Sequence, residues 1–156
     1  MARKSWNVQL NDSKNYPLVK TISPEAAIRL GGERMLLAPP LEYDAIMKRV
    51  PRGKLLTTDR IRAYLAKKYN ADATCPLCTG IFIGIAANAS AERKGVDETP
   101  YWRTLKSGGE LNEKYPEGLD AHKIRLEMEG HTVIQKGKRY FVADFESKLF
   151  DIEESK

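Results

Sequence analysis

The chain has 156 residues but only two cysteines and two histidines, and this scarcity limits its chemistry. Two cysteines are too few for the disulfide framework of a small secreted domain, so Cys75 and Cys78 need another explanation. His122 and His131 lie nine positions apart, whereas the histidines of a zinc finger have roughly three to five residues between them. We therefore expect no metal site.

Long apolar runs are absent as well. No stretch reaches the ~18 apolar residues of a membrane helix, and the N-terminal MARKSWNVQL lacks an apolar core followed by a cleavage site. We therefore expect a cytoplasmic protein with no membrane partner. A catalytic carboxylate pair, a Ser-His-Asp set and a phosphate-binding glycine loop are also not evident, so we expect no cofactor.

The charge of the chain is positive and unevenly distributed. The net charge is +5 and the pI about 9.2, and residues 48–68 contain eight basic residues against one acid, Asp59. Such a stripe is typical of a surface that binds nucleic-acid phosphates. A solvated helix face in a basic protein is the alternative interpretation.

Three parts are expected along the chain. Residues 1–39 are a polar extension with one short helix that begins after Ser23, residues 40–145 form the main domain, and residues 146–156 are a peripheral acidic tail. Helices are expected at 41–50, from Thr57 or Thr58 to about 68, from Thr74 to about 93 and at 119–129, with a hairpin around 136–137. The expected fold class is mainly α with a small β hairpin, a winged helix-turn-helix-like domain.

The motif CPLC at 75–78 resembles the redox site of glutaredoxins, in which a helix N-terminus lowers the pKa of a thiol. That fold places a buried strand directly before the first cysteine, whereas the preceding KKYNADAT is polar. Small core side chains at the start of a helix are therefore the favoured interpretation of both cysteines.

The next segment, TGIFIGIAANA, carries no charge. A helix that reads bases in the major groove would carry Arg, Asn or Gln. This helix is therefore either part of the core, which we favour for its Ile and Phe positions, or an apolar element that closely approaches the minor groove.

Residues 99–111, TPYWRTLKSGGEL, place two aromatics and an arginine just before a glycine pair. Tyr and Trp favour strands, and glycine supplies the positive φ angles of a tight turn. Local preferences thus favour a strand that enters a hairpin at Gly108-Gly109.

The order of these segments resembles the DNA-binding domain of alkylguanine-DNA alkyltransferases and their alkyltransferase-like relatives. The resemblance covers roughly residues 41–133, and its most specific motifs are VPRGK, PYWRTLKSGG and LEMEGH. Residues 1–39 lie outside it. The resemblance implies a DNA-binding protein whose main domain is helical.

In that family, a Pro-Cys-His-Arg segment carries the cysteine that accepts the alkyl group. The resemblance aligns Pro100 and Arg103 with its ends, Tyr101 with the cysteine and Trp102 with the activating histidine. A phenol with a pKa near ~10 is a poor nucleophile at neutral pH, and an indole cannot relay a proton. The resemblance therefore implies a protein that is not an enzyme. A separate hypothesis is that Cys75, at the start of a helix, has become an alternative alkyl acceptor.

The resemblance also implies two sets of binding residues. We call the first the relic pocket; it comprises Pro100, Tyr101, Trp102, Arg103, Asn88 and Glu129. The second would contact DNA and comprises Arg49, Arg52, Lys54, Thr57, Thr58, Arg60, Lys106 and Ser107. Thr58 replaces a tyrosine that helps to turn a nucleotide out, and the intercalating arginine falls near Thr79 or Gly80, so both flipping devices are missing.

The expected function is non-catalytic binding of double-stranded DNA, with alkylated or damaged DNA recognised through the aromatic relic pocket and repair proteins as further partners. The alternative is a module on the same fold that has lost DNA binding and binds a small ligand or a protein. Reversing a charge in the basic stripe, as in Arg60→Glu, should abolish binding in the first case only.

Overall fold

The computed structural model describes residues 5–153, which form six α-helices, three 3-10 helices and short strands. The α-helices are α1 (Trp6–Leu10), α2 (Pro24–Leu30), α3 (Pro40–Arg49), α4 (Thr58–Lys68), α5 (Pro76–Glu92) and α6 (Gly118–Met128). The strands are β1 (Leu18–Thr21), β2 (Arg34–Leu37), β3 (Leu56–Thr57), β4 (Ala73–Thr74), β5 (Thr104–Leu105), β6 (Val133–Lys136) and β7 (Arg139–Val142). The 3-10 helices are η1 (Tyr101–Arg103), η2 (Ser107–Gly109) and η3 (Phe145–Lys148). The prediction of a mainly α fold is confirmed.

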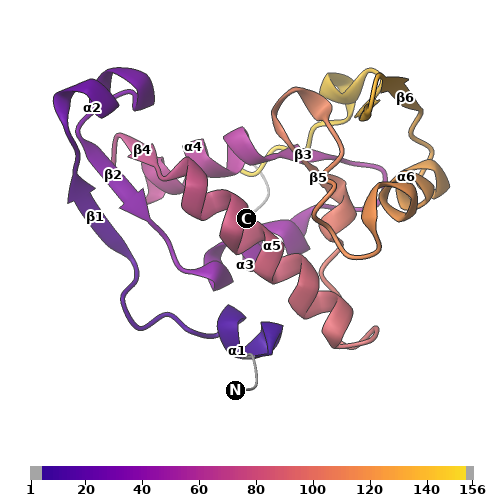
Figure 1. The fold of residues 1–156 in the computed structure, drawn as a ribbon, viewed down its shortest axis with the longest axis horizontal. Coiled ribbons are helices and arrows are strands. Elements are labelled where there is room, and N and C mark those ends of the chain that lie inside the picture. Colours follow the sequence, from indigo (N-terminus) through magenta and orange to yellow (C-terminus); the bar gives the residue numbers. More distant parts are fainter. Residues whose placement is uncertain (1–4, 154–156) are drawn as a thin grey trace.

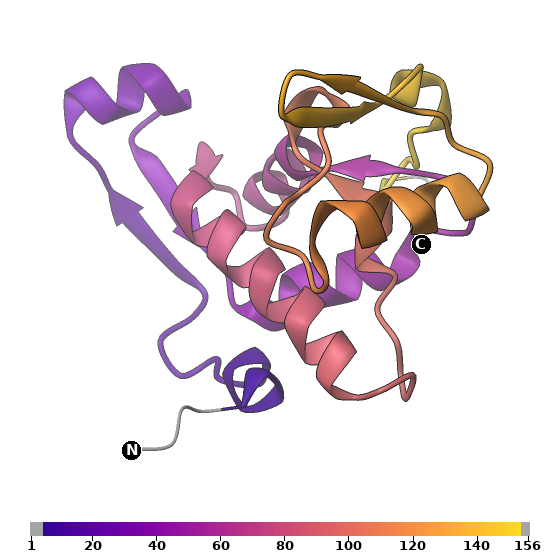
Figure 2. The ribbon, with the colours of Figure 1, turned by 45° about the vertical axis from the view of Figure 1, so that its right-hand side comes forward.

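Helix α5 crosses the middle of the molecule, with α1 and α3 against it (Figures 1 and 2). Ile83 and Ile85 are buried, as expected for a core helix. Ile81 is 52% exposed, so the core prediction is wrong for that residue. The reason is helical geometry, because Leu77 and Ile81, four residues apart, share the outward face. The cap also differs from expectation, since Cys75, not Thr74, is the N-cap of α5.

The N-terminal extension is more structured than expected. It holds two helices instead of one, and β1 pairs antiparallel with β2, which in turn pairs parallel with β4. Leu36 and Ala38 are fully buried in the main core. Strands of four residues are too short to show a clear alternation in the sequence, and their pairing partner lies far along the chain.

Residues 101–109 do not form a hairpin strand. Tyr101–Arg103 are the 3-10 helix η1, and the following β5 pairs parallel with β3. Gly109 has φ +83° and lies under the Phe145 ring, where an added Cβ would come within 2.5 Å of a ring carbon. Gly109 thus serves the close packing of η2 against Phe145 of η3, which local turn preferences do not reveal.

The hairpin expected around residues 136–137 is present as β6 and β7. It is attached to the main domain through Leu111, whose amide donates to the Tyr140 carbonyl at 2.9 Å. In Figure 1 the hairpin end of the molecule lies well away from the β1–β2 end.

The acidic tail is not peripheral over its described part, which ends at residue 153. The Leu55 amide donates to the Lys148 carbonyl at 2.9 Å, and the Phe150 amide donates to the Leu55 carbonyl at 2.8 Å. Ile152 is 6% exposed. Ile152 in the core and Phe150 packed against it therefore fix the tail in spite of its acidic neighbours.

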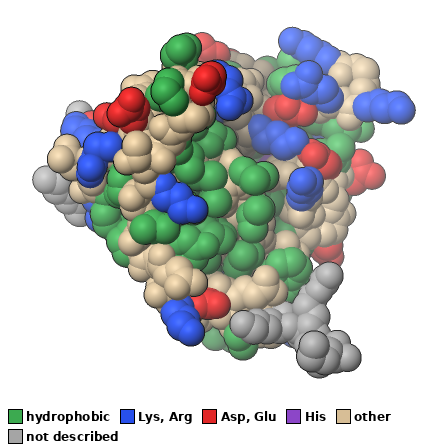
Figure 3. Space-filling view, turned by 60° about the vertical axis from the view of Figure 1, so that its left-hand side comes forward, with side chains coloured by type: hydrophobic (Ala, Val, Ile, Leu, Met, Phe, Trp, Pro, Cys, Tyr) green, Lys and Arg blue, Asp and Glu red, His purple; other side chains and the backbone are tan. Residues whose placement is uncertain are grey.

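One face of the molecule carries many hydrophobic side chains in its middle, with Lys and Arg side chains both among them and around them (Figure 3). Among residues 5–153, no helix combines the length and the apolar character needed to cross a bilayer.

Candidate functional site

A buried polar cluster lies behind the segment that resembles the family's acceptor motif. The Trp102 indole N–H donates to Glu129 Oε2 at 2.8 Å, and Arg103 donates to both Glu129 oxygens, with Nη2 2.8 Å from Oε2 and Nε 2.9 Å from Oε1. Arg103 Nη1 also donates to the Val50 carbonyl at 2.8 Å. The Gly53 amide adds a longer bond to Glu129 Oε1 at 3.4 Å. Four of the six predicted relic-pocket residues follow one another at 100–103, and this cluster joins two of them to Glu129.

Glu129 is ionised in this cluster. Burial raises its pKa, but the bonds from Arg103 and Trp102 outweigh that effect, so the pKa of Glu129 lies below its usual value. The Glu129 and Arg103 side chains are 4% and 15% exposed. A carboxylate with its oxygens already occupied cannot serve as a general base for a neighbouring nucleophile.

His122 and Tyr115 hold η1 from the side of α6. His122 is 1% exposed, its Nε2 lies 2.8 Å from the Trp102 carbonyl, and its Nδ1 accepts from the Asn112 amide at 3.3 Å. These partners fit a neutral ring with the proton on Nε2. The Tyr115 hydroxyl donates to the Thr104 carbonyl at 2.8 Å. Together these contacts fix the backbone that carries Tyr101.

Tyr101 opens onto a small cavity of about 250 Å³. Arg125 of α6 also lines it, with Cζ 5.8 Å from the centre of the Tyr101 ring and 4.4 Å from that of Trp102. Burial raises the pKa of Tyr101, so its hydroxyl stays protonated at neutral pH. The other lining residues are Ser90, Ala91, Lys94, Gly95, Glu98, Pro116 and Glu117.

Trp102 cannot present its ring to a base in this structure. It is 6% exposed, Glu129 accepts from its indole, and Arg125 lies over the ring. Tyr101 is likewise buried, at 4% exposure, so stacking of the aromatic pair on a base stays a prediction. Tyr101 is the member of the pair that lines the cavity.

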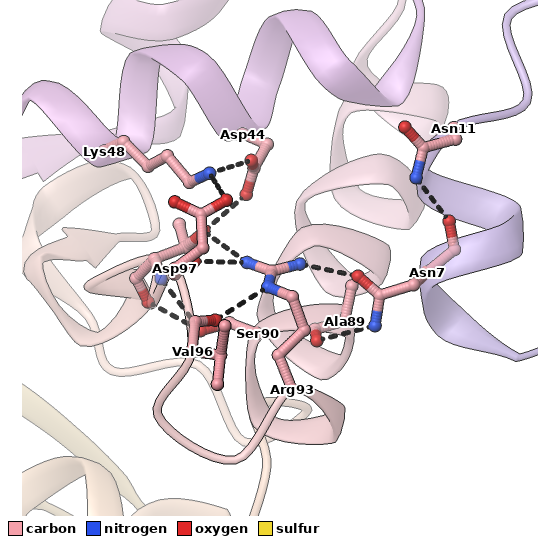
Figure 4. A network of polar contacts seen from close by, with 10 residues as sticks. Asn7, Asn11, Asp44, Lys48, Ala89, Ser90, Arg93, Val96 and Asp97 are labelled. Carbon is pink, nitrogen blue, oxygen red and sulfur yellow. Dashed lines mark hydrogen bonds and ion pairs between the residues drawn. The ribbon is translucent and has the colours of Figure 1, made fainter.

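The loop at 94–99 forms one wall of the cavity, and Arg93 fixes it (Figure 4). Arg93 donates to the carbonyls of Val96 and Asp97 at 3.2 and 2.9 Å, and to Asn7 Oδ1 of α1 at 2.6 Å. Lys48 Nζ lies 2.8 Å from Asp97 Oδ2. The N-terminal extension thus supports the cavity wall through Arg93.

Other predicted pocket residues lie elsewhere. Pro100 precedes η1 as its N-cap, and the Asn88 side chain donates from Nδ2 to the Gly84 carbonyl of its own helix at 2.8 Å. Cys75 caps the start of α5, whereas Ser90 near the end of that helix lines the Tyr101 cavity. Fifteen residues at about 1.5 Å per residue separate them by ~22 Å. Cys75 therefore cannot accept an alkyl group from a base bound beside Tyr101.

The predicted DNA-binding residues partly gather at the start of α4. Thr57 pairs in parallel with Leu105, and each is followed by a predicted DNA-binding residue, Thr58 at the start of α4 and Lys106 after β5. Both line a cavity of about 310 Å³ that also includes Arg62, Lys114 and the outward face of α5 at Leu77, Gly80 and Ile81. The Ser107 hydroxyl lies 3.2 Å from Asp59 Oδ1, and Lys106 is paired with Glu113 at 2.6 Å.

The remaining members of that set have different surroundings. Arg49 donates to the Ile152 carbonyl at 2.5 Å and Arg52 donates to the Met128 carbonyl at 2.9 Å, so both stabilise the fold. Thr57 is buried, with 2% exposure. Lys54 and Arg60 are exposed on the surface.

Sequence reasoning missed Arg125, His122 and Arg62. Arg125 and His122 are separated by three positions on α6, a spacing that puts both on the side facing η1, but neither belongs to a motif. No group of three or more His, Cys, Asp or Glu side chains within residues 5–153 is arranged to hold a metal ion.

Comparisons with known proteins identify a shared fold. No protein-family model and no curated protein matches the chain. The structure of S. pombe Atl1 in complex with damaged DNA containing O6-carboxymethylguanine is 21% identical, covers 70% of this chain and 91% of its own, and gives a TM-score of 0.47. The structure of S. pombe ATL in complex with DNA is 17% identical, with coverages of 72% and 94% and a TM-score of 0.50. The second likeness shows that this chain has the fold of the alkyltransferase-like branch that its sequence resembles.

Proposed function

We propose that the protein is a non-catalytic, alkyltransferase-like DNA-binding protein that recognises an alkylated or otherwise damaged base. The observation that carries this proposal is the cavity at Tyr101. The residue aligned with the family's acceptor cysteine lines a cavity whose volume, about 250 Å³, is close to the lower end of small-molecule sites, ~300 Å³. Such a cavity suits a single base better than a larger group.

The chemistry of the cavity supports binding of a base. Arg125 offers a guanidinium that can lie over the π face of a base, as it already does over Trp102. The protonated Tyr101 hydroxyl can donate or accept one hydrogen bond. Glu98 and Glu117 offer acceptors for base N–H groups at the same cavity.

The same residues support binding without alkyl transfer. A neutral phenol is a weak nucleophile, and the carboxylate of Glu129 is occupied by Trp102 and Arg103. A protein that binds a lesion without removing it requires a partner that carries out the repair. We therefore include repair proteins in the proposal.

Basic residues around the start of α4 support the contact with the DNA backbone. Thr58 and Lys106 line the same cavity there, and exposed Arg60 belongs to the first turn of α4. Backbone amides at a helix N-terminus favour phosphate oxygens. Asp59 in that turn accepts from Ser107. Its negative charge would be offset by the positive charges of Lys54 and Arg60, which would contact the phosphates.

The test is fluorescence anisotropy with matched duplexes, one of which contains an alkylated guanine, at several salt concentrations. Arg60→Glu should weaken binding to both duplexes. Because log K falls as log salt rises, loss of that phosphate contact should make the fall shallower, by about one in the slope. Arg29→Glu on α2 is the matched control, because it makes the same charge change at an exposed position on the N-terminal extension.

Arg125→Lys tests the base pocket separately. Lysine keeps the charge but loses the planar guanidinium, so the preference for the alkylated duplex should fall while binding to the plain duplex is kept. Binding that is independent of salt, or a preference that survives Arg125→Lys, would contradict the proposal.

One observation favours the ligand-binding alternative. A larger cavity of about 590 Å³, within the usual range for small molecules, lies between the N-terminal extension and α5 and is lined by Trp6, Tyr16 and Phe82 among others. If no duplex binds even at low salt, this cavity becomes the site to test, with Phe82→Ala as the first variant.

A further inference from the structure

Cys75 and Cys78 lie together in the first turn of α5. Cys75 is the N-cap, and its Sγ accepts a hydrogen bond from the Cys78 amide at 3.3 Å. Cys75 is 8% exposed and Cys78 is half-buried. The two thiols are therefore neighbours, with the more accessible one on the helix itself.

The structure changes one part of the argument against a redox pair, which otherwise includes the lack of a β-α-β pattern in the sequence. That part rested on a polar segment before Cys75, but Ala73–Thr74 form the two-residue strand β4, which pairs parallel with β2. The Cys75 amide continues this pairing by donating to the Leu36 carbonyl at 2.9 Å. A C-x-x-C pair directly after a strand and at the start of a helix is the setting in which dithiols and disulfides interconvert.

The backbone of Cys75 is fixed on both sides. Its amide is held by Leu36, and its carbonyl accepts from the Thr79 hydroxyl at 2.8 Å. The Tyr43 hydroxyl lies 2.9 Å from the Thr79 hydroxyl, which anchors that residue to α3. The backbone of Cys75 is therefore anchored to β2 and, through Thr79, to α3.

We propose that Cys75 and Cys78 form a reversible intramolecular disulfide by exchange with a small-molecule disulfide such as oxidised glutathione. The Cys78 thiol loses its proton to solvent, and its thiolate attacks one glutathione sulfur, which releases the other glutathione as a thiol. The Cys75 thiolate then attacks the Cys78 sulfur of the mixed disulfide and releases the second glutathione. Two protein thiols are thus oxidised, and one glutathione disulfide is reduced to two thiols.

The surroundings set the speed of this exchange. Burial raises the pKa of Cys78 to about 11, so little thiolate is present at neutral pH. The pair therefore responds to a sustained change in redox conditions and is not expected to turn over rapidly as an oxidoreductase.

The disulfide would constrain the turn that holds Leu77, which is 74% exposed and lies between the two cysteines. Leu77 and Ile81 line the same cavity as Thr58 and Lys106. An effect of oxidation on DNA affinity follows only if the proposed function is correct, whereas formation of the disulfide does not depend on it.

The test is a thiol count on the full chain after equilibration in glutathione buffers of increasing oxidised fraction. Samples are quenched with acid, alkylated with N-ethylmaleimide and analysed by intact-mass and peptide mass spectrometry. We expect both alkylation sites to disappear together, the chain to lose the mass of two hydrogens, and dithiothreitol to restore both thiols, with an unchanged circular dichroism spectrum.

Two variants identify the order of attack. Cys75→Ser should stop at a mixed glutathione disulfide on Cys78, and Cys78→Ser should leave the buried Cys75 unmodified. Wild-type chains that stay fully alkylatable, or that accumulate only mixed disulfides, would overturn the proposal. Because the assay counts thiols, failure of DNA binding would leave its outcome unchanged.

Discussion

His122 should make the stability of the protein depend on pH between neutral and mildly acidic conditions. Burial lowers the pKa of this histidine from 6.5 to about 4. Its Nδ1 accepts from the Asn112 amide, so a proton there would face another donor. A histidine with a depressed folded pKa stabilises the fold fully above its unfolded pKa, and this contribution is lost as the pH falls toward the folded pKa.

The size of the effect follows from the two pKa values. One pKa unit is worth about 1.4 kcal/mol, so the full loss below pH ~4 is about 3 kcal/mol. At pH ~5 the unfolded histidine is mostly protonated and the folded one mostly neutral, which gives a loss of about 2 kcal/mol relative to pH ~7.5. Such a loss is a large fraction of the stability of a domain of this size.

The assay is urea unfolding followed by circular dichroism at several pH values, for the wild type and for His122→Gln. Glutamine can still donate to the Trp102 carbonyl but does not titrate, so its free energy of unfolding should change about 2 kcal/mol less over this range. His131 also has a lowered pKa, but it is present in both proteins and cancels in the comparison. Equal pH dependence in the two proteins would refute the assignment of a buried neutral His122.

Three further substitutions test the packing around the site by urea unfolding. Glu129→Gln should destabilise the fold by about 3 kcal/mol, because it leaves the Arg103 charge buried without its partner; a loss below ~1 kcal/mol would mean that the pair is open to water. Gly109→Ala should lower the free energy of unfolding by about 2 kcal/mol or more, since its methyl group would overlap the Phe145 ring at a positive φ. An unchanged free energy of unfolding would contradict the close packing of Gly109 against that ring. Asn7→Ala should lower the free energy of unfolding by about 1 kcal/mol and speed amide hydrogen exchange in the loop at 94–99. Unchanged exchange would show that α1 does not support that loop.

Much of the helical scaffold could be predicted from the sequence. The apolar spacing and the flanking prolines and glycines of α3, α4 and α6 are local signals, and the hairpin around residues 136–137 is equally local. Strands β1 and β2 could not be predicted, because each gains its hydrogen bonds from a partner elsewhere in the chain. The same holds for β5, whose partner β3 lies about fifty residues earlier.

The site was predictable only in part. The family resemblance singled out Tyr101, Trp102 and Glu129, but residue types alone do not reveal that both rings are buried or that Tyr101 lines a cavity. These features depend on how α6 packs on η1, which places Arg125 near both rings and His122 against the Trp102 carbonyl. Side chains brought together by tertiary packing leave no spacing pattern in the sequence.

The N-terminal extension affects where this chain can be divided for expression or for fusion to another protein. A cut at residue 39 would remove Leu10, Leu36 and Ala38 from the core, together with the carbonyl that holds Cys75. It would also remove Asn7, which accepts a hydrogen bond from Arg93, and so weaken the support of the loop beside Tyr101. The region that resembles known DNA-binding domains is therefore not a unit that can be excised, and useful truncations are those that keep residues 5–38.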